Sequence, residues 1–278
     1  MDFYQQLGRE HTIGAHRGYR ALWPENTLKA FEAAIGHFDF IELDIQPSED
    51  GTLMILHDET MERTTDVEQH TSRPRPHRID EHDAAWLQRV DAGGWFARHD
   101  PFGTRAAGLM PPEAEGFAPI PTLPEVVALC RKHRMPLNVE IKDSPRADTE
   151  RLLRDLLEAI APLRAEGVPL LVSSFNHRYL AALKTLDPDL KLAANVEYTH
   201  PPDLTNYLKE LGVIGYHVDA PLIGSTPVAE LASLGITCGA FTLNDPAQQA
   251  ACFDRGFRTV FADMTGDLYR AIHKSTSS

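Results

Sequence analysis

Two kinds of hydrophobic pattern alternate along the chain. Short apolar runs rich in β-branched residues predict strands, and longer stretches in which apolar residues recur every three or four positions predict helices. The expected strands are Thr12–Ala15, Phe40–Asp44, Leu137–Ile141, Leu170–Ser173, Lys191–Asn195, Ile214–Val218, Thr237–Thr242 and Thr259–Ala262. The expected helices are Asn26–Gly36, Leu123–His133, Thr149–Leu163, Asn176–Leu186, Pro202–Leu211, Thr226–Leu234, Pro246–Arg255 and Gly266–His273, the first of them capped by Asn26.

Eight strand–helix units are the number found in a (β/α)8 barrel, the TIM barrel. The alternative for this alternation is a doubly wound open sheet, which usually carries a glycine-rich GxGxxG turn after its first strand. No such turn follows Thr12–Ala15. We therefore expect an α/β fold of the TIM-barrel type, in which residues 1–278 form a single domain.

The alternation is interrupted between about residues 60 and 120. Charges, prolines and glycines predominate there, and the only clear helical pattern is a short one around Asp83–Val90. A segment of this length without regular structure is usually functional or disordered when it lies inside a compact domain. We expect an insertion on the catalytic rim of the barrel, between the second and third βα units, with too few apolar residues for a core of its own.

The composition narrows the possible functions. The 278 residues include 40 Asp and Glu against 27 Lys and Arg, a formal net charge of −13, which disfavours binding to nucleic acid or to an anionic membrane. No apolar run approaches the length of a membrane span, and the first residues lack the apolar stretch of a signal peptide. Three widely separated cysteines, Cys130, Cys238 and Cys252, predict buried reduced thiols. The sequence thus predicts a cytoplasmic protein that neither binds nucleic acid nor inserts into membranes, and it carries no pattern that fixes the oligomeric state.

Charged residues occupy alternate positions of two expected core strands. Because side chains alternate between the two faces of a strand, Glu42 and Asp44 point together into the barrel, as do Glu140 and Lys142. Strands of a closed parallel barrel are covered outside and packed inside, so unpaired inward carboxylates are costly. Three carboxylates without a cysteine suit an all-oxygen site for a hard divalent cation, Mg2+ or Ca2+. A structural ion-pair network is the alternative.

Two histidines and two cations are expected at the same rim. His16 and His57 each follow the end of an apolar run. Arg17 comes directly after His16, and Lys142 comes directly after the expected strand Leu137–Ile141. One imidazole can deprotonate a nucleophile while the other protonates a leaving alkoxide. A guanidinium and an ammonium can hold phosphate oxygens. A metal, two cations and an acid–base pair are the parts that phosphoryl transfer from an anionic diester requires.

Several short motifs together resemble the glycerophosphodiester phosphodiesterases. They are His16-Arg17-Gly18, Pro24-Glu25-Asn26-Thr27, Glu42-x-Asp44, His57-Asp58, Arg63-Thr64-Thr65, Asp91-Ala92-Gly93, Pro121-Thr122-Leu123, Glu140-Ile141-Lys142, Ser174-Phe175, Phe241-Thr242-Leu243-Asn244 and Asp263. They occur in the family's order and span nearly the whole chain. The resemblance implies a TIM barrel that cleaves glycerophosphodiesters, such as glycerophosphocholine or glycerophosphoethanolamine, to sn-glycerol 3-phosphate and an alcohol.

The resemblance also implies roles for individual residues. Glu42, Asp44 and Glu140 would bind the metal, His16 and His57 would be the acid–base pair, and Arg17 and Lys142 would hold the phosphate of a small-molecule substrate. The insertion would help to shape the substrate pocket, and Phe241 stands where the family often has tryptophan, so the apolar wall of the pocket is expected to differ. A lysophospholipase-D-like activity and a non-catalytic barrel that binds phosphodiesters are the alternative functions.

Overall fold

Eight parallel strands form a closed barrel in the computed structural model, which describes residues 1–274. The first strand pairs with the second and with the last, and these two pairings close the sheet. The strands are β1 (Thr12–Ala15), β2 (Phe40–Pro47), β4 (Leu137–Ile141), β5 (Leu170–Ser174), β6 (Leu192–Val196), β7 (Gly215–Asp219), β8 (Thr237–Phe241) and β9 (Thr259–Ala262). The TIM barrel expected from the sequence is therefore confirmed, and most strand limits agree to within two residues.

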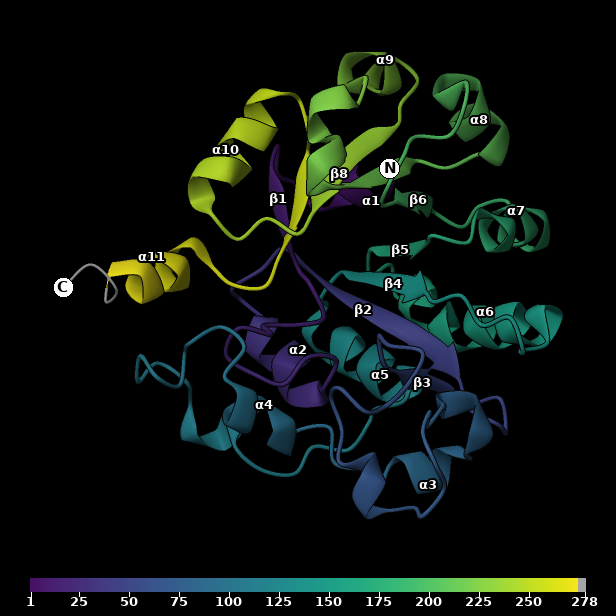
Figure 1. Ribbon diagram of the computed structural model, residues 1–278. Helices are drawn as coiled ribbons and strands as arrows, with labels where there is room; N and C mark the ends of the chain where they lie inside the picture. Colours follow the sequence, from purple (N-terminus) through teal and green to yellow (C-terminus); the bar gives the residue numbers. More distant parts are fainter. Residues whose placement is uncertain (275–278) are drawn as a thin grey trace.

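Helices cover the outside of the barrel (Figure 1). They are α2 (Leu28–Ala34), α5 (Leu123–His133), α6 (Thr149–Ala165), α7 (His177–Leu186), α8 (Leu204–Leu211), α9 (Val228–Ser233), α10 (Pro246–Asp254) and α11 (Gly266–Lys274), and a 3-10 helix, η4 (Ala220–Ser225), precedes α9. The prediction that Asn26 caps α2 is wrong, because Thr27 is the capping residue and its side chain accepts a hydrogen bond from the Ala30 N–H. Asn26 adopts a left-handed backbone conformation with φ of 57°, and this conformation turns its side chain toward the barrel.

The main apolar core lies between the strands and the helices. On β2, Ile41, Leu43 and Ile45 face outward into this core, as the period-two pattern predicts. A second cluster fills the amino end of the barrel, where Phe3 and Tyr4 of the short helix α1 (Phe3–Gln6) pack with residues from inside the barrel. The sequence pattern did not indicate α1, since four residues are too few to display a helical period. The three cysteines are buried and free, as expected.

The second strand continues into a hairpin before the chain leaves the barrel. Strand β3 (Leu53–Ile55) pairs antiparallel with β2 after a turn at Asp50 and Gly51, so that Ile45 lies opposite Ile55. Residues 48–52 form the turn, and an Asp-Gly pair favours such turns because glycine readily adopts the positive φ that Gly51 has. Because β3 runs back along β2, the N–H of Leu56 donates to the C=O of Asp44 at 3.1 Å, and His57 and Asp58 follow at this level.

Residues 60–120 fold against one side of the barrel, next to α2, α5 and β3 (Figure 1). Their elements are α3 (Ala84–Leu87), α4 (Gly94–His99), η1 (Val67–Gln69), η2 (Ile79–Glu81) and η3 (Pro112–Ala114). The segment lies inside the second βα unit, between β3 and α5, and not between the second and third units as expected. The expectation that this segment lacks a core is wrong, because Met61, Val67, Ile79, Leu87 and Val90 form a buried cluster with the end of β3. Their spacing in the sequence is irregular, so periodicity does not reveal them. No helix among residues 1–274 is long and apolar enough to cross a membrane.

Candidate active site

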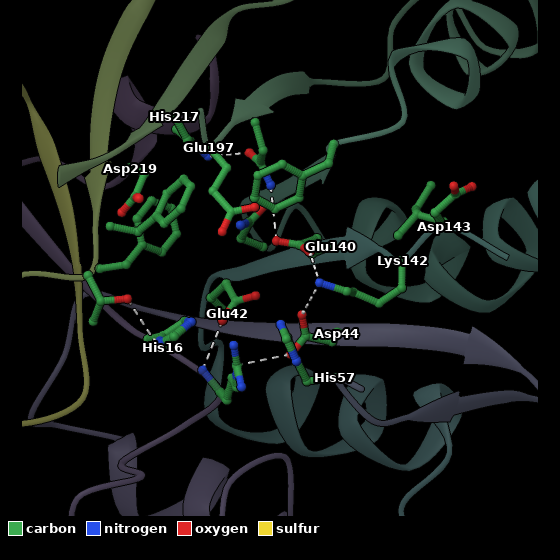
Figure 2. Close-up of a pocket in the computed structure, with 18 residues that line it drawn as sticks. His16, Glu42, Asp44, His57, Glu140, Lys142, Asp143, Glu197, His217 and Asp219 are labelled. Atoms are coloured by element: carbon green, nitrogen blue, oxygen red, sulfur yellow. Dashed lines mark hydrogen bonds and ion pairs between the residues drawn. The ribbon is translucent and has the colours of Figure 1, made fainter. Parts of the chain in front are cut away.

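A pocket of about 480 Å3 opens at the carboxyl ends of the barrel strands, the end at which barrel enzymes carry out their chemistry. Figure 2 shows the side chains that line it. The structure brings all eight predicted site residues together there: His16, Arg17, Glu42, Asp44, His57, Glu140, Lys142 and Phe241. Of the described residues that line the pocket, none lies between 60 and 120, so the insertion does not form its wall as the resemblance implied.

Three carboxylates form a cluster at the bottom of the pocket. Glu42 and Asp44 on β2 and Glu140 on β4 each offer one oxygen, and these atoms lie within 4.8 Å of one another. Their residues are only 3%, 1% and 8% exposed. The strand register places Asp44 opposite Glu140, which explains why two separate strands supply one cluster. The cluster could bind a metal ion.

Nitrogen donors hold each carboxylate in place. The backbone N–H of Arg17 donates to Glu42 Oε2 at 2.8 Å, and Asn26 Nδ2 donates to Asp44 Oδ2 at 2.8 Å. Lys142 Nζ donates to Glu140 Oε1 at 2.8 Å. The left-handed conformation of Asn26 thus supplies a hydrogen bond to the site instead of a helix cap.

The carboxylates differ in how readily they give up a proton. Burial raises the pKa of Glu42 well above its ordinary value, and the charges of Asp44 and Glu140 add to the effect. Burial also raises the pKa of Glu140, although Lys142 opposes it. Burial alone would raise the pKa of Asp44, but Lys142 and Arg17 outweigh it and hold that pKa well below its usual range. Without a cation, like charges therefore repel within the cluster, and Glu42 keeps its proton to a higher pH than an ordinary glutamate does.

Each of the two histidines is held by its own aspartate. His16 Nδ1 lies 2.8 Å from Asp263 Oδ1, and His57 Nδ1 lies 2.7 Å from Asp58 Oδ1. A carboxylate can only accept hydrogen bonds, so both Nδ1 atoms carry a proton and both Nε2 atoms are left for other partners. Burial lowers the pKa of His16 to about 4, with Arg17 adding to the effect and Asp263 opposing it.

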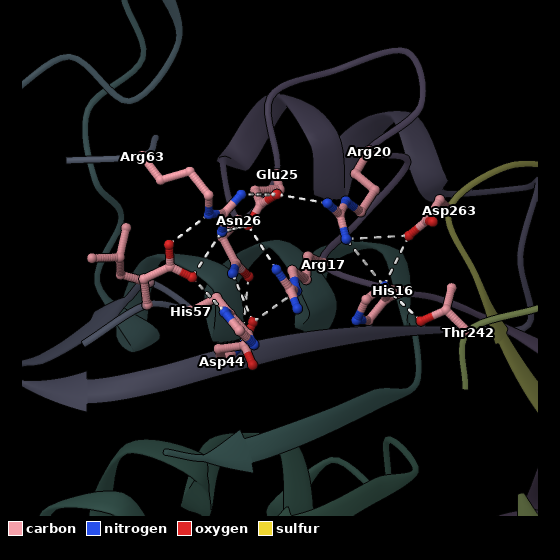
Figure 3. A network of polar contacts seen from close by, with 12 residues as sticks. His16, Arg17, Arg20, Glu25, Asn26, Asp44, His57, Arg63, Thr242 and Asp263 are labelled. Atoms are coloured by element: carbon pink, nitrogen blue, oxygen red, sulfur yellow. Dashed lines mark hydrogen bonds and ion pairs between the residues drawn. The ribbon is translucent and has the colours of Figure 1, made fainter. Parts of the chain in front are cut away.

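A buried glutamate connects the two histidine–aspartate pairs through arginines (Figure 3). Arg63 binds Asp58 and also donates from Nη2 to Glu25 Oε1 at 2.7 Å. Arg20 lies 3.4 Å from Asp263 Oδ1 and 2.9 Å from Glu25 Oε2. Glu25 therefore supports the site from behind, and we call this set of residues the Glu25 network. Arg63 is also the contribution of the insertion to the site.

Comparison with known proteins agrees with this geometry. The family model of the glycerophosphoryl diester phosphodiesterase family matches residues 16–267. The chain belongs to this family. A glycerophosphodiester phosphodiesterase from Bacillus altitudinis is 31% identical over 260 residues, which cover 90% of this chain and 94% of the relative. One from Bacillus subtilis (strain 168) is 27% identical, covering 94% and 85% of the two chains.

Solved structures give the same result. A phosphodiesterase from Oleispira antarctica, in complex with the product sn-glycerol-3-phosphate, is 26% identical with a TM-score of 0.77 and covers 98% of this chain and 100% of that one. A glycerophosphodiester phosphodiesterase from Agrobacterium tumefaciens str. C58 shares the fold at 20% identity, with a TM-score of 0.68 and coverage of 92% and 97%. Members of this family are phosphoric diester hydrolases, and the chain is an enzyme of that class.

The two predicted phosphate ligands of this family member lie among the acidic groups. Arg17 Nη1 donates to Glu25 at 2.8 Å, and its Nε lies 3.4 Å from Asp44 Oδ2. Lys142 Nζ lies 3.7 Å from Asp44 Oδ1 and 5.6 Å from the centre of the Phe175 ring. Both cations line the pocket, so they can face an anionic substrate while they offset the charge of the carboxylates.

The far wall of the pocket combines the predicted Phe241 with residues that the sequence did not single out for a role there. Phe241 at the end of β8 meets Phe175 edge to face, with the ring centres 5.7 Å apart. Asn195, Glu197 and Asp219 also line the pocket, and Figure 2 shows the two acidic ones across it from the histidines. They come from the ends of β6 and β7 or just beyond, so the rule that barrel sites gather at strand ends would have found them.

Proposed function

We propose that the protein hydrolyses glycerophosphodiesters to sn-glycerol 3-phosphate and an alcohol, with a divalent cation as its cofactor. One observation carries the proposal: the buried cluster of Glu42, Asp44 and Glu140 shares a pocket with two histidines, each paired with an aspartate. The neighbouring Oleispira antarctica enzyme binds the product sn-glycerol-3-phosphate, which supports the same product here.

The carboxylate cluster suits Mg2+ or Ca2+. Its ligand atoms are all oxygen, it contains neither cysteine nor histidine, and hard divalent cations prefer such ligands. Glu42, Asp44 and Glu140 would hold the ion in their ionised forms, so binding is expected to release a proton at any pH where Glu42 is still protonated. When bound, such a cation neutralises the charge that develops on phosphate oxygens.

The histidines are proposed to move the protons. Because burial keeps His16 neutral at physiological pH, its Nε2 is available to take a proton from the attacking oxygen. His57, protonated on both ring nitrogens, would then give its Nε2 proton to the leaving alkoxide. Asp263 and Asp58 hold the two rings through their Nδ1 atoms, which leaves Nε2 of His16 free to accept a proton and Nε2 of His57 free to donate one. Arg17 and Lys142 would hold the phosphate between them.

Two routes use the same set of residues. In one, the 2-hydroxyl of glycerol attacks phosphorus and gives a cyclic phosphate that water then opens. In the other, water attacks directly. An analogue without the 2-hydroxyl separates them, because it can react only by the direct route.

A product-release assay tests the function. Purified protein is given glycerophosphocholine, glycerophosphoethanolamine, glycerophosphoinositol or lysophosphatidylcholine with Mg2+ or Ca2+, and glycerol 3-phosphate is measured with a coupled enzyme while the free alcohol is measured separately. We expect metal-dependent turnover of the glycerophosphodiesters and its loss in Glu42→Gln. Faster release of choline from lysophosphatidylcholine would indicate a lysophospholipase-D-like enzyme, and absence of turnover with either metal would indicate a barrel that only binds phosphodiesters.

A further inference from the structure

A series of buried hydrogen bonds runs from the metal-site carboxylate of Glu140 down through the barrel to helix α1. Asn195 Nδ2 lies 3.0 Å from Glu140 Oε2, and Asn195 Oδ1 lies 3.1 Å from His217 Nδ1. His217 Nε2 lies 2.7 Å from the hydroxyl oxygen of Tyr4. Figure 2 shows the upper part of this series. None of the four residues is more than 8% exposed, so water cannot readily replace any of these bonds.

The chemistry of the groups fixes the direction of every bond. The carboxylate of Glu140 only accepts, so the amide nitrogen of Asn195 donates to it and the amide oxygen faces His217. That oxygen also only accepts, and His217 Nδ1 must therefore carry the proton. Burial lowers the pKa of His217 to about 3, so the ring is neutral and its Nε2 accepts. The hydroxyl of Tyr4 must then donate. The acceptor role of Glu140 at one end of the series thus determines the donor role of Tyr4 at the other end.

The surrounding backbone leaves space for this series. A Cβ atom at Gly215 on β7 would lie 2.1 Å from the Tyr4 hydroxyl oxygen, and one at Gly239 on β8 would lie 2.7 Å from His217 Cδ2. Any other residue at either position would push the tyrosine or the histidine aside. Tyr4 itself is fixed by the capping box of α1 and by its edge-to-face contact with Phe3. The amino-terminal helix is thus joined to the barrel interior by packing and by a directed hydrogen bond.

Buried polar groups need partners, and stability alone could account for the lower bonds. The upper end has a further consequence for the site. The other oxygen of Glu140 is held by Lys142 at 2.8 Å, and Lys142 is the cation proposed to contact the substrate phosphate. When the ammonium turns toward phosphate, Asn195 is the group that still holds the carboxylate in position.

We propose that Asn195, His217 and Tyr4 form a positioning relay that orients the Glu140 carboxylate for the metal ion, so that helix α1 acts in the active site from the opposite end of the barrel. The relay rests on the proposed function only in its assumption that Glu140 is a metal ligand. Hydrogen-bonded groups behind a metal ligand typically change metal affinity or activity by about 10–100-fold when removed.

The test removes one hydroxyl group at the far end. Tyr4→Phe keeps the ring and its packing but takes the proton from the last bond, which frees His217 and Asn195 to reorient. We expect the Mg2+ and Ca2+ affinities of the metal-free protein, measured by isothermal titration calorimetry, to fall about 10–100-fold. Turnover should show a matching rise in the metal concentration needed for half-maximal rate, with kcat largely recovered at saturating metal.

A matched control is available on the outer face of the same barrel. Tyr216 on β7 also bonds a histidine, with its hydroxyl 2.8 Å from His200 Nδ1, but it lies in the core between strands and helices. Tyr216→Phe therefore removes the same kind of bond without touching the relay, and we expect its metal affinity to equal that of the wild type. A double variant of Tyr4→Phe and Asn195→Ala should bind metal no more weakly than Asn195→Ala alone.

The outcomes separate the relay from the proposed function. Unchanged metal affinity in Tyr4→Phe, with only a lower melting temperature, would show that the relay is purely structural. Equal losses in Tyr4→Phe and Tyr216→Phe, additive losses in the double variant, or a wild type that binds neither cation would overturn it as well. A wild type that binds metal and shows the relay effect, but turns over no diester, would instead overturn the proposed function and leave the relay standing.

Discussion

Removal of the divalent cation is expected to destabilise the protein, and to do so more strongly at high pH than at low pH. The ligand oxygens of Glu42, Asp44 and Glu140 lie within 4.8 Å of one another. At that separation two ionised carboxylates repel by about 3.5 kcal/mol if the effective dielectric constant is about 20. Glu42 faces two such neighbours, and this repulsion adds to burial in raising its pKa. Lys142 and Arg17 reduce the repulsion mainly at Asp44.

The sign of the pH dependence follows from the raised pKa of Glu42. In the folded, metal-free protein Glu42 keeps its proton to a higher pH than in the unfolded chain, where its pKa is about 4.3. Its contribution to stability is fully present below that ordinary pKa and is lost as pH rises through the raised one. Glu140 shifts in the same direction. A bound cation needs these carboxylates ionised, so the stabilisation by metal grows as pH rises through the same range.

The size of the effect is measurable. Mg2+ at about 100 times its dissociation constant stabilises the folded state by about 2.7 kcal/mol, which corresponds to roughly 5–10 °C in melting temperature for a chain of this length. Differential scanning calorimetry with Mg2+ or EDTA should show such a shift at pH 8 and a clearly smaller one at pH 5.5. Carboxyl groups with lowered pKa values, such as Asp58 and Glu25, stabilise the folded protein less in acid, whether metal is present or not. Their contribution therefore cancels when the samples with Mg2+ and with EDTA are compared at the same pH.

Glu42→Gln is the control, since it keeps the shape of the side chain and removes the charge. At pH 8 the metal-free variant should melt above the metal-free wild type, because the repulsion with Asp44 and Glu140 is gone. It should not respond to Mg2+. A Mg2+ shift of equal size at both pH values, a larger shift at pH 5.5, or a variant that responds as the wild type does would refute this reasoning.

Three further results are expected. With a nitrophenyl leaving group, which needs no protonation, the rate of His57→Ala should recover to within about tenfold of the wild type, while that of His16→Ala stays about 10²–10⁴-fold lower. Equal recovery of the two variants in rate assays would contradict the proposed division of roles. Glu25→Gln leaves three arginines without their buried carboxylate partner, so the free energy of unfolding measured in urea should fall by about 3–5 kcal/mol. A fall of less than about 1 kcal/mol would show that the Glu25 network is not needed for stability. Phe241→Ala should raise KM for glycerophosphodiesters about tenfold and leave the Mg2+ affinity unchanged. The control Phe117→Ala removes an exposed aromatic ring outside the pocket and should change neither kcat, KM nor the Mg2+ affinity.

The sequence by itself is sufficient to predict the barrel fold and the carboxylate cluster. Period-two alternation on β2 and β4 sends Glu42, Asp44 and Glu140 inward, and this inference needs only the local geometry of a strand. His16 is expected at the correct end because it follows β1, and the parallel strands of a barrel end at one rim. His57 reaches the same rim for a different reason, because it follows β3, which runs antiparallel to β2 and brings the chain back beside Asp44. Each of these conclusions combines the local pattern of single strands with the general rule that the side chains of a barrel meet inside it and at its carboxyl rim.

Only the tertiary structure decided which distant side chains complete the site. His16 and Asp263 are 247 positions apart, and Tyr4 and His217 are 213 apart, so no local pattern connects them. The same holds for Asn26, whose sequence context suggests a helix cap but whose side chain reaches Asp44 once the strands are in register. Periodicity records which face of an element a residue occupies. Which groups meet across the barrel depends on how it closes and on where glycines leave space between its strands.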